Sequence, residues 1–224
     1  MSESLVFHDA PRDLRSFTAE SERKLLLWLA ARLPAWVNSD HLTGLGLAAM
    51  LAAGAAYALS GSRLGWLHVV NLLLFVNWFG DSLDGTLARY RNRQRPRYGF
   101  YVDHMVDVLG FLALFVGLAV SGHISAAVAA GLVVAYYLLS IHVYLSTYTL
   151  GVFQIAYGRV GGTELRILLA GANLALLFWP SLCLAGWQIR LFDLCGTLAI
   201  SGMVVTLAAA ILRSVRRLYQ MERV

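Results

Sequence analysis

The sequence predicts an all-α membrane protein with six transmembrane helices, preceded by an N-terminal amphipathic helix at the membrane interface. Two observations support this class. Hydrophobic residues make up 58% of the 224 residues and charged residues only 14%, whereas a soluble domain carries about 25% charged residues. Several apolar runs also approach the roughly 20 residues that a helix needs to cross a bilayer.

The first 40 residues are predicted to form a cytoplasmic segment that ends in the interfacial helix. Residues 1–17 are polar, and they hold no basic stretch followed by an apolar core, so we expect no cleaved signal peptide. From Thr18 to Leu33, charged residues alternate with leucines and Trp28, a pattern too charged to span and typical of an interfacial helix. Pro34 is expected to end it. Residues 41–224 then form one six-helix transmembrane domain.

Six apolar runs define the expected spanning helices, and short polar breaks separate them. The runs cover residues 42–60, 66–88, 99–121, 125–150, 164–184 and 191–212. With six spans, both termini lie on the same side of the membrane. Only Arg63 and Arg190, among the basic residues, fall on the opposite side. The positive-inside rule therefore places both termini in the cytoplasm, in what we expect to be the plasma (inner) membrane of a prokaryote.

Four aspartates lie where the second and third runs meet. Asp81 and Asp84 are three residues apart, and Asp103 and Asp107 are four apart. These spacings project each pair from one face of its helix. The linker between the runs is short, so we expect the helices to be antiparallel neighbours and the two pairs to converge near the cytoplasmic surface.

Such a cluster needs a counter-charge. An ionised aspartate near the hydrocarbon core costs about 2.5–3.5 kcal/mol on insertion scales, and four together also repel one another. One or two divalent cations would remove both costs. Ligands that are all oxygen favour Mg²⁺, Mn²⁺ or Ca²⁺ over zinc. Magnesium also shares its coordination shell with phosphate, so a diphosphate substrate fits this site.

The small residues among the acids leave room for a ligand. Gly85 and Ala88 form a flat patch on which a planar base or ribose could rest, and Gly80 and Gly99 permit close approach. Arg89 follows, with a guanidinium suited to holding a phosphate. The competing interpretation is that the acids are helix-end charges paired with the arginines of residues 89–97.

The segment from Asp81 to Asp107 resembles the signature of the CDP-alcohol phosphotransferase family. The matching positions are Asp81-x-x-Asp84-Gly85-x-x-Ala88-Arg89, followed after nine residues by Gly99-x-x-x-Asp103-x-x-x-Asp107. The six-span plan with its preceding helix extends the resemblance over the whole chain. The segment from Ser39 to Thr43 also resembles the family's Pro-Asp-x-x-Thr element, with Ser39 in place of the proline.

The resemblance implies a role for each position of the motif. Asp81, Asp84 and Asp103 would hold one divalent metal, Mg²⁺ or Mn²⁺, and Asp81, Asp103 and Asp107 would hold a second. Asp107 would also act as the general base. The CDP portion would bind the remaining positions of the motif and the segment before it, namely Asp40, Thr43, Gly85, Ala88, Arg89 and Gly99. The implied reaction transfers a substituted phosphate from a CDP-linked donor to an acceptor alcohol and releases CMP.

The acceptor is less well specified by the sequence. Candidate residues for the acceptor or lipid head group are Glu164, Arg166, Arg159 and His142. Two alternatives stay open: CDP-diacylglycerol with a soluble acceptor, which we favour, and a soluble CDP-choline or CDP-ethanolamine type of donor with a lipid acceptor. A transporter or a non-enzymatic scaffold is a third, although the chain lacks the repeats typical of transporters.

The expected partners are the donor, the acceptor alcohol, membrane lipids and a second copy of the chain, with no nucleic acid. Glycine-containing helix faces around Gly171 and from Gly196 to Gly202 could support close packing in a homodimer.

Overall fold

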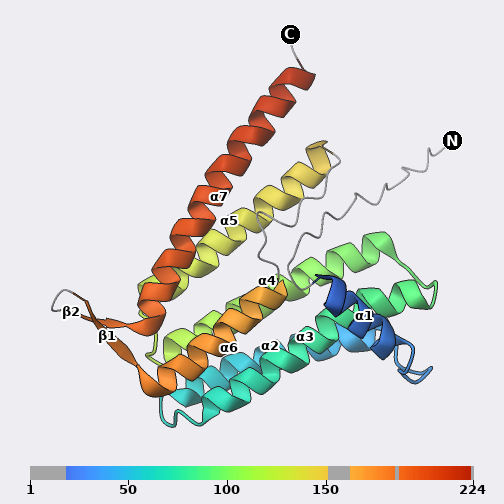
Figure 1. Cartoon of the computed structure of the whole chain (residues 1–224). Coiled ribbons are helices and arrows are strands. Elements are labelled where there is room, and N and C mark those ends of the chain that lie inside the picture. Colours follow the sequence, from blue (N-terminus) through green and yellow to red (C-terminus); the bar gives the residue numbers. More distant parts are fainter. Residues whose placement is uncertain (1–18, 151–161, 185–186, 223–224) are drawn as a thin grey trace.

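The computed structural model describes residues 19–150, 162–184 and 187–222 (Figure 1). Within these ranges the chain forms seven helices and one small hairpin. The elements are α1 (Ala19–Ala30), α2 (Ser39–Ser60), α3 (Trp66–Tyr90), α4 (Pro96–Val120), α5 (Ala126–Leu150), α6 (Gly162–Phe178), β1 (Ser181–Leu184), β2 (Trp187–Arg190) and α7 (Leu191–Met221). The all-α class is confirmed, with the hairpin as a minor addition that the sequence did not predict.

Four of the described helices, α2, α4, α5 and α7, are long and apolar enough to cross a membrane. Of the other two long helices, α6 has only 17 residues, and α3 carries polar side chains such as His68 and Asn77 within its apolar run. The four apolar helices indicate an integral membrane protein. The plan of six spans stays a prediction.

Helix α2 lies at the centre of the bundle, and α3 and α4 pack along it rather than along each other. Glycines make both crossings close. A Cβ on Gly80 of α3 would lie 2.6 Å from the Leu42 carbonyl oxygen and 2.8 Å from the Gly46 nitrogen, and a Cβ on Gly117 of α4 would overlap the Gly54 backbone. The expectation that α3 and α4 are direct neighbours is therefore wrong, because α2 occupies the space between them.

A buried polar network fixes α6 against α2 and α3. The Tyr57 hydroxyl donates to Asn173 Oδ1 at 2.7 Å, and Asn173 Nδ2 donates to Asn71 Oδ1, also at 2.7 Å. Tyr57 and Asn173 are fully buried. Since an unpaired polar group in such a place costs about 1–3 kcal/mol, these mutual bonds specify how α6 packs.

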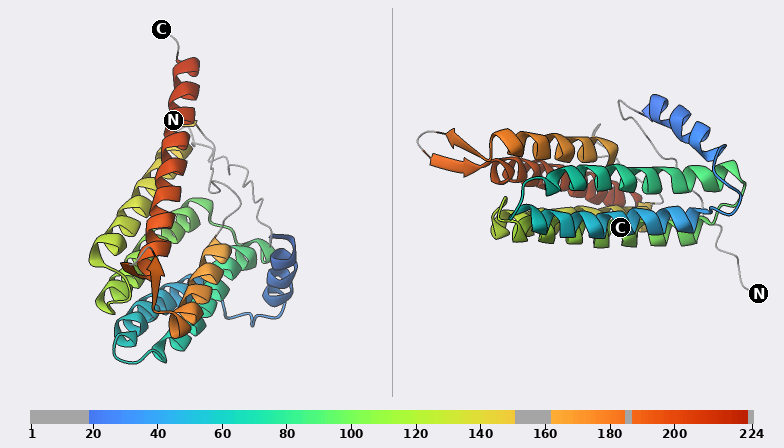
Figure 2. Two further views of the ribbon diagram at one scale, coloured as in Figure 1. Left: turned by 60° about the vertical axis from the view of Figure 1, so that its left-hand side comes forward. Right: turned by 90° about the horizontal axis from the view of Figure 1, so that it is seen from below.

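Helices α5 and α7 lie side by side and extend away from the rest of the bundle (Figures 1 and 2). A Cβ on Gly196 of α7 would lie 2.6 Å from a methyl group of Val128 on α5, so this glycine already serves packing within the chain. Gly171 and Gly202, by contrast, have nothing within 4 Å of a built Cβ. A homodimer contact at these glycines stays a prediction.

The fifth apolar run ends earlier than predicted. Helix α6 stops at Phe178 instead of reaching residue 184, because Pro180 disfavours helical backbone at the residue before it and cannot donate to a helix itself. Residues 181–184 then pair antiparallel with residues 187–190. The last helix is longer than predicted and continues to Met221.

Helix α1 occupies most of the range in which the interfacial helix was predicted. Leu26 and Ala30 are buried and pack in one cluster with Leu83 and Leu87 of α3. In Figure 2, α1 lies beside the end of the bundle at which α3 stops. The structure thus shows α1 docked on α3, while its location at a membrane interface stays a prediction.

Candidate active site

The four aspartates come from α3 and α4, on either side of the N-terminal end of α2. Asp81, Asp84 and Asp103 are half-buried and Asp107 is exposed. The charge of Asp107 interacts with those of the other three carboxylates, and the charge of Asp84 with those of Asp81 and Asp103. The predicted convergence of the two pairs is therefore present, although their helices meet α2 instead of each other.

Asp81 is held by an arginine from a distant part of the chain. The Arg166 guanidinium on α6 donates to Asp81 Oδ2 at 2.6 Å and to Asn77 Oδ1 at 2.7 Å. Asn77 in turn donates to the Gly46 carbonyl of α2 at 3.0 Å. The sequence singled out Arg166 but missed Asn77. A polar residue one helical turn before Asp81 in an apolar run was the signal that could have found it.

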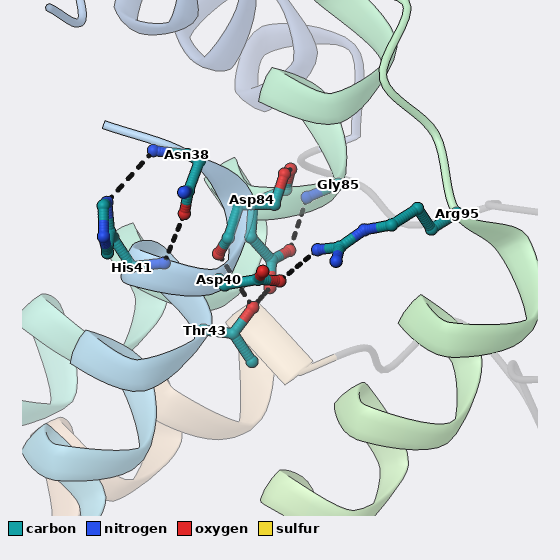
Figure 3. Close-up of polar contacts among 8 residues, drawn as sticks. Asn38, Asp40, His41, Thr43, Asp84, Gly85 and Arg95 are labelled. Atoms are coloured by element: carbon teal, nitrogen blue, oxygen red, sulfur yellow. Dashed lines mark hydrogen bonds and ion pairs between the residues drawn. The ribbon is translucent and has the colours of Figure 1, made fainter. Parts of the chain in front are cut away.

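Asp84 contacts the beginning of α2. The Thr43 hydroxyl donates to Asp84 Oδ2 at 2.5 Å, and the Ser39 hydroxyl donates to the Asp84 backbone carbonyl at 3.0 Å. Asn38 caps this end of α2 by accepting from the His41 backbone N–H. Figure 3 shows the contacts of Thr43 with Asp84 and of Asn38 with His41. The segment from Ser39 to Thr43, which the sequence associated with the nucleotide, thus lies directly against the first aspartate pair.

Arg89 in the last turn of α3 and Arg95 just before α4 contact different partners. Arg95 pairs with the exposed Asp40 carboxylate (Figure 3). Arg89 donates to the Thr86 hydroxyl at 3.3 Å, and its guanidinium lies over Gly85, which has no side chain to obstruct it. The Arg89 side chain thus covers Gly85 in this structure, and the open patch at Gly85 stays a prediction.

Arg91 has a structural role that the sequence did not reveal. Its guanidinium donates to the backbone carbonyls of Leu33 and Pro34, each at 3.0 Å, and to that of Val37. These carbonyls belong to the segment that joins α1 to α2. Arg91 therefore ties that segment to the end of α3, close to the site.

A face of α5 borders the second aspartate pair. The Tyr136 ring stacks on Phe111 with centroids 4.0 Å apart, and the Tyr144 ring meets His104 edge-on at 5.1 Å. Residues 104 and 111 share one face of α4, and Asp107 lies between them on that face. The charge of Asp107 reaches both tyrosines. Neither tyrosine was assigned a role from the sequence.

The remaining predicted residues fall in several places. Ala88, Glu164 and His142 are half-buried, on α3, α6 and α5 respectively. Gly99 lies near the start of α4, and no atom of the described residues lies within 4 Å of a built Cβ there. Arg159 lies outside the described residues.

Metal binding rests on the chemistry of the donor set. Among the described residues, no three acidic, histidine or cysteine side chains are arranged to hold a metal ion together. In the described part of the chain, the Arg166 guanidinium is the positive charge that interacts with Asp107. Three other carboxylates interact with Asp107 at the same time and repel it. Four carboxylates with this excess of negative charge fit a hard divalent cation.

Comparison with known families agrees with this site. The model of the CDP-alcohol phosphatidyltransferase family matches residues 36–212, which include α2 and all four aspartates. The chain belongs to the CDP-alcohol phosphatidyltransferase family. It is therefore a membrane enzyme of phospholipid biosynthesis that transfers substituted phosphate groups from a CDP-alcohol, and its family generally depends on divalent metal. No curated protein matches the chain.

Proposed function

We propose that this enzyme takes its phosphatidyl group from CDP-diacylglycerol, transfers it to an acceptor alcohol and releases CMP, with two Mg²⁺ or Mn²⁺ ions at the aspartates. The observation that carries the proposal is the meeting of both aspartate pairs beside the start of α2, where Thr43 contacts Asp84 at 2.5 Å. A diphosphate and its metals require such an acidic centre.

The ligand set follows the spacing of the motif. Asp81, Asp84 and Asp103 would hold one ion, and Asp81, Asp103 and Asp107 the other. When bound, the ions would neutralise the negative charge of the diphosphate and of the departing CMP. Side chains of the enzyme would accept the proton and hold the substrates.

The protein groups divide the reaction between them. Asp107 accepts the proton of the acceptor hydroxyl, whose oxygen attacks the phosphorus that bears the diacylglycerol. A new phosphorus–oxygen bond forms as the bond to CMP breaks. Arg89 and Gly85 hold the nucleotide end, together with the Ser39–Thr43 segment. Arg166 holds Asp81 in place and presents positive charge to an anionic substrate.

CMP release tests the proposal directly. The purified protein, in mixed micelles with Mg²⁺ or Mn²⁺, is incubated with CDP-diacylglycerol and a panel of alcohols that includes serine, glycerol phosphate and inositol phosphate. We expect CMP with one of these acceptors. CMP only from CDP-choline or CDP-ethanolamine with diacylglycerol would reverse the donor assignment. Absence of CMP with every pair would contradict the enzymatic assignment and leave a transporter or scaffold.

The proposed topology places both termini and the site on the cytoplasmic face, with the chain as a homodimer. The distribution of arginines supports the orientation. Reporter fusions at residue 224 and in the segment 61–65 test it, and opposite locations are expected. Chemical crosslinking in native membranes tests the dimer, and a purely monomeric product would contradict it.

A further inference from the structure

Glu22 on α1 joins three helices that are distant in the sequence. Its Oε1 accepts a hydrogen bond from the Trp78 indole N–H of α3 at 2.7 Å and another from the Thr163 hydroxyl of α6 at 2.9 Å. The side chain is half-buried, and one carboxylate oxygen serves both donors. Such charge-assisted bonds are stronger than those between neutral groups.

The position of Thr163 gives this contact a consequence at the active site. Thr163 and Arg166 are three residues apart on the first turns of α6, so they lie on one face. Arg166 is the residue that reaches Asp81 at 2.6 Å and Asn77 at 2.7 Å. The start of α6 is therefore held twice, to α1 through Thr163 and to α3 through Arg166.

Glu22 and Arg166 both contact the same short stretch of α3. Trp78, the second donor to Glu22, directly follows Asn77, which receives Arg166. Helix α1 also packs its apolar residues Leu26 and Ala30 into the cluster that contains Leu83 of α3. The carboxylate of Glu22 thus lies at the edge of an apolar contact that already fixes the distance from α1 to α3.

We propose that Glu22 is a positioning residue of the transferase, which holds the first turn of α6 so that the Arg166 guanidinium stays on Asp81. The inference rests on the proposed function, because Asp81 belongs to the proposed metal centre. It makes α1 part of the active-site assembly. Loss of Glu22 would release Thr163 and let Arg166 move away from Asp81.

The substitution Glu22→Ala tests this role against a matched control. Glu20→Ala removes the same charge from the same helix, but Glu20 is exposed and bonds only Lys24 on the outer side among the contacts described. We expect Glu22→Ala to lower kcat about tenfold, the effect of losing roughly 1.4 kcal/mol of transition-state stabilisation. Glu20→Ala should match the unmodified enzyme. Equal rates in the two variants would overturn the proposal.

Two further comparisons separate positioning from simple stabilisation. Glu22→Gln keeps an oxygen that can accept both hydrogen bonds, so it should restore most of the rate. In an Arg166→Ala background, Glu22→Ala should add little further loss, because the group that it positions is absent. An undiminished effect in that background would show that Glu22 does not act through Arg166.

Trypsin cleavage provides a readout that needs no activity. The Arg166 side chain is only 17% exposed, so cleavage after it should be slow in the folded protein. We expect faster cleavage there in Glu22→Ala and unchanged cleavage in Glu20→Ala, measured by mass spectrometry of the fragments. Unchanged cleavage in both would contradict the proposal even if no transfer reaction were found.

Should Glu22→Ala fail to fold, single-donor variants carry the same test. Thr163→Val removes one hydrogen bond and keeps the shape of the side chain, and Trp78→Phe removes the other and leaves a smaller aromatic ring. Each is expected to produce a smaller increase in cleavage after Arg166 and a smaller loss of rate. Two folded variants that behave like the unmodified enzyme in both measurements would refute the role of Glu22.

Discussion

Arg166 and Asp81 form an ion pair of 2.6 Å between α6 and α3, although 85 residues separate them in the chain. Both side chains are largely withdrawn from solvent, at 17% and 27% exposed. Breaking such a pair leaves an uncompensated charge, which costs about 3–5 kcal/mol when burial is complete. The pair therefore couples the packing of α6 to the charge balance of the aspartate centre.

Removal of the Arg166 guanidinium should impair both turnover and stability. We expect Arg166→Ala to lower kcat/KM about 10- to 100-fold. Arg166→Lys should keep only part of the activity, because an ammonium lacks the forked guanidinium that reaches Asn77 and Asp81 together. Arg190→Ala is the control, since the Arg190–Asp193 pair is longer, at 3.9 Å, and half of the Arg190 side chain is exposed. Steady-state CMP release measures all three variants. A fully active Arg166→Ala would contradict the coupling.

The aspartates should be individually indispensable. Asp81→Asn and Asp107→Asn each remove one negative charge from the proposed metal centre, and Asp107→Asn also removes the base, so turnover should fall below detection in both. Asp193→Asn is the matched control. Asp193 accepts a hydrogen bond from the Ser125 backbone N–H beside α5, and the amide oxygen of an asparagine at this position can accept the same bond. Membrane fractionation confirms insertion. Full activity in either active-site variant would refute the assigned role.

The crossing of α2 and α3 should tolerate no side chain at Gly80. A Cβ there would lie 2.6 Å from the Leu42 carbonyl, and rigid backbone cannot yield as a side chain can. Overpacking of this kind costs about 1–3 kcal/mol, so Gly80→Ala should unfold at lower temperature in detergent. Gly44→Ala is the control on α2, where nothing lies within 4 Å. A Gly80→Ala variant as stable as Gly44→Ala would contradict the close crossing.

The hydroxyl of Tyr144 should contribute to the reaction through its position near Asp107. Tyr144→Phe keeps the ring that meets His104 at 5.1 Å and removes the hydroxyl. We expect the hydroxyl to make one hydrogen bond in the reacting complex, and the loss of about 0.5–1.5 kcal/mol with it predicts a fall in kcat/KM of about 3- to 10-fold. Tyr148→Phe is the control, one turn further on α5 and 90% exposed. Equal kinetics in the two variants would show that the phenol has no part in the reaction.

Acidification should weaken the junction between α2 and the loop before α5. Burial lowers the pKa of His123 from its ordinary value of 6.5, and His123 Nε2 lies 3.0 Å from the Ser60 hydroxyl. The unfolded chain therefore takes up this proton at a higher pH than the folded one, and the free energy of unfolding falls as pH drops below about 6.5. Thermal unfolding across that range should show a shallower pH dependence in His123→Asn. Identical profiles would contradict this assignment.

The sequence by itself predicted most of the helix positions and the class of reaction. Apolar runs bounded by polar breaks predicted the six long helices to within a few residues, with two exceptions: α6 ends early, before Pro180, and α7 continues to Met221, well past the predicted end at residue 212. The spacing of the four aspartates predicted a divalent-metal site, and the resemblance of the whole motif to a known family implied the class of reaction, which the family match then showed. Both results depend on local patterns, namely helical periodicity and the energetic cost of charge in an apolar chain.

Only the tertiary structure decided which distant groups meet the aspartates. Arg166 on Asp81, Thr43 on Asp84 and Glu22 on Thr163 join residues that lie 85, 41 and 141 positions apart. Contacts over such separations depend on how the helices pack, and here the glycine crossings of α2 set that packing. Periodicity shows which face of a helix is apolar but not which helix will cover it, so these partners become visible only in the folded chain.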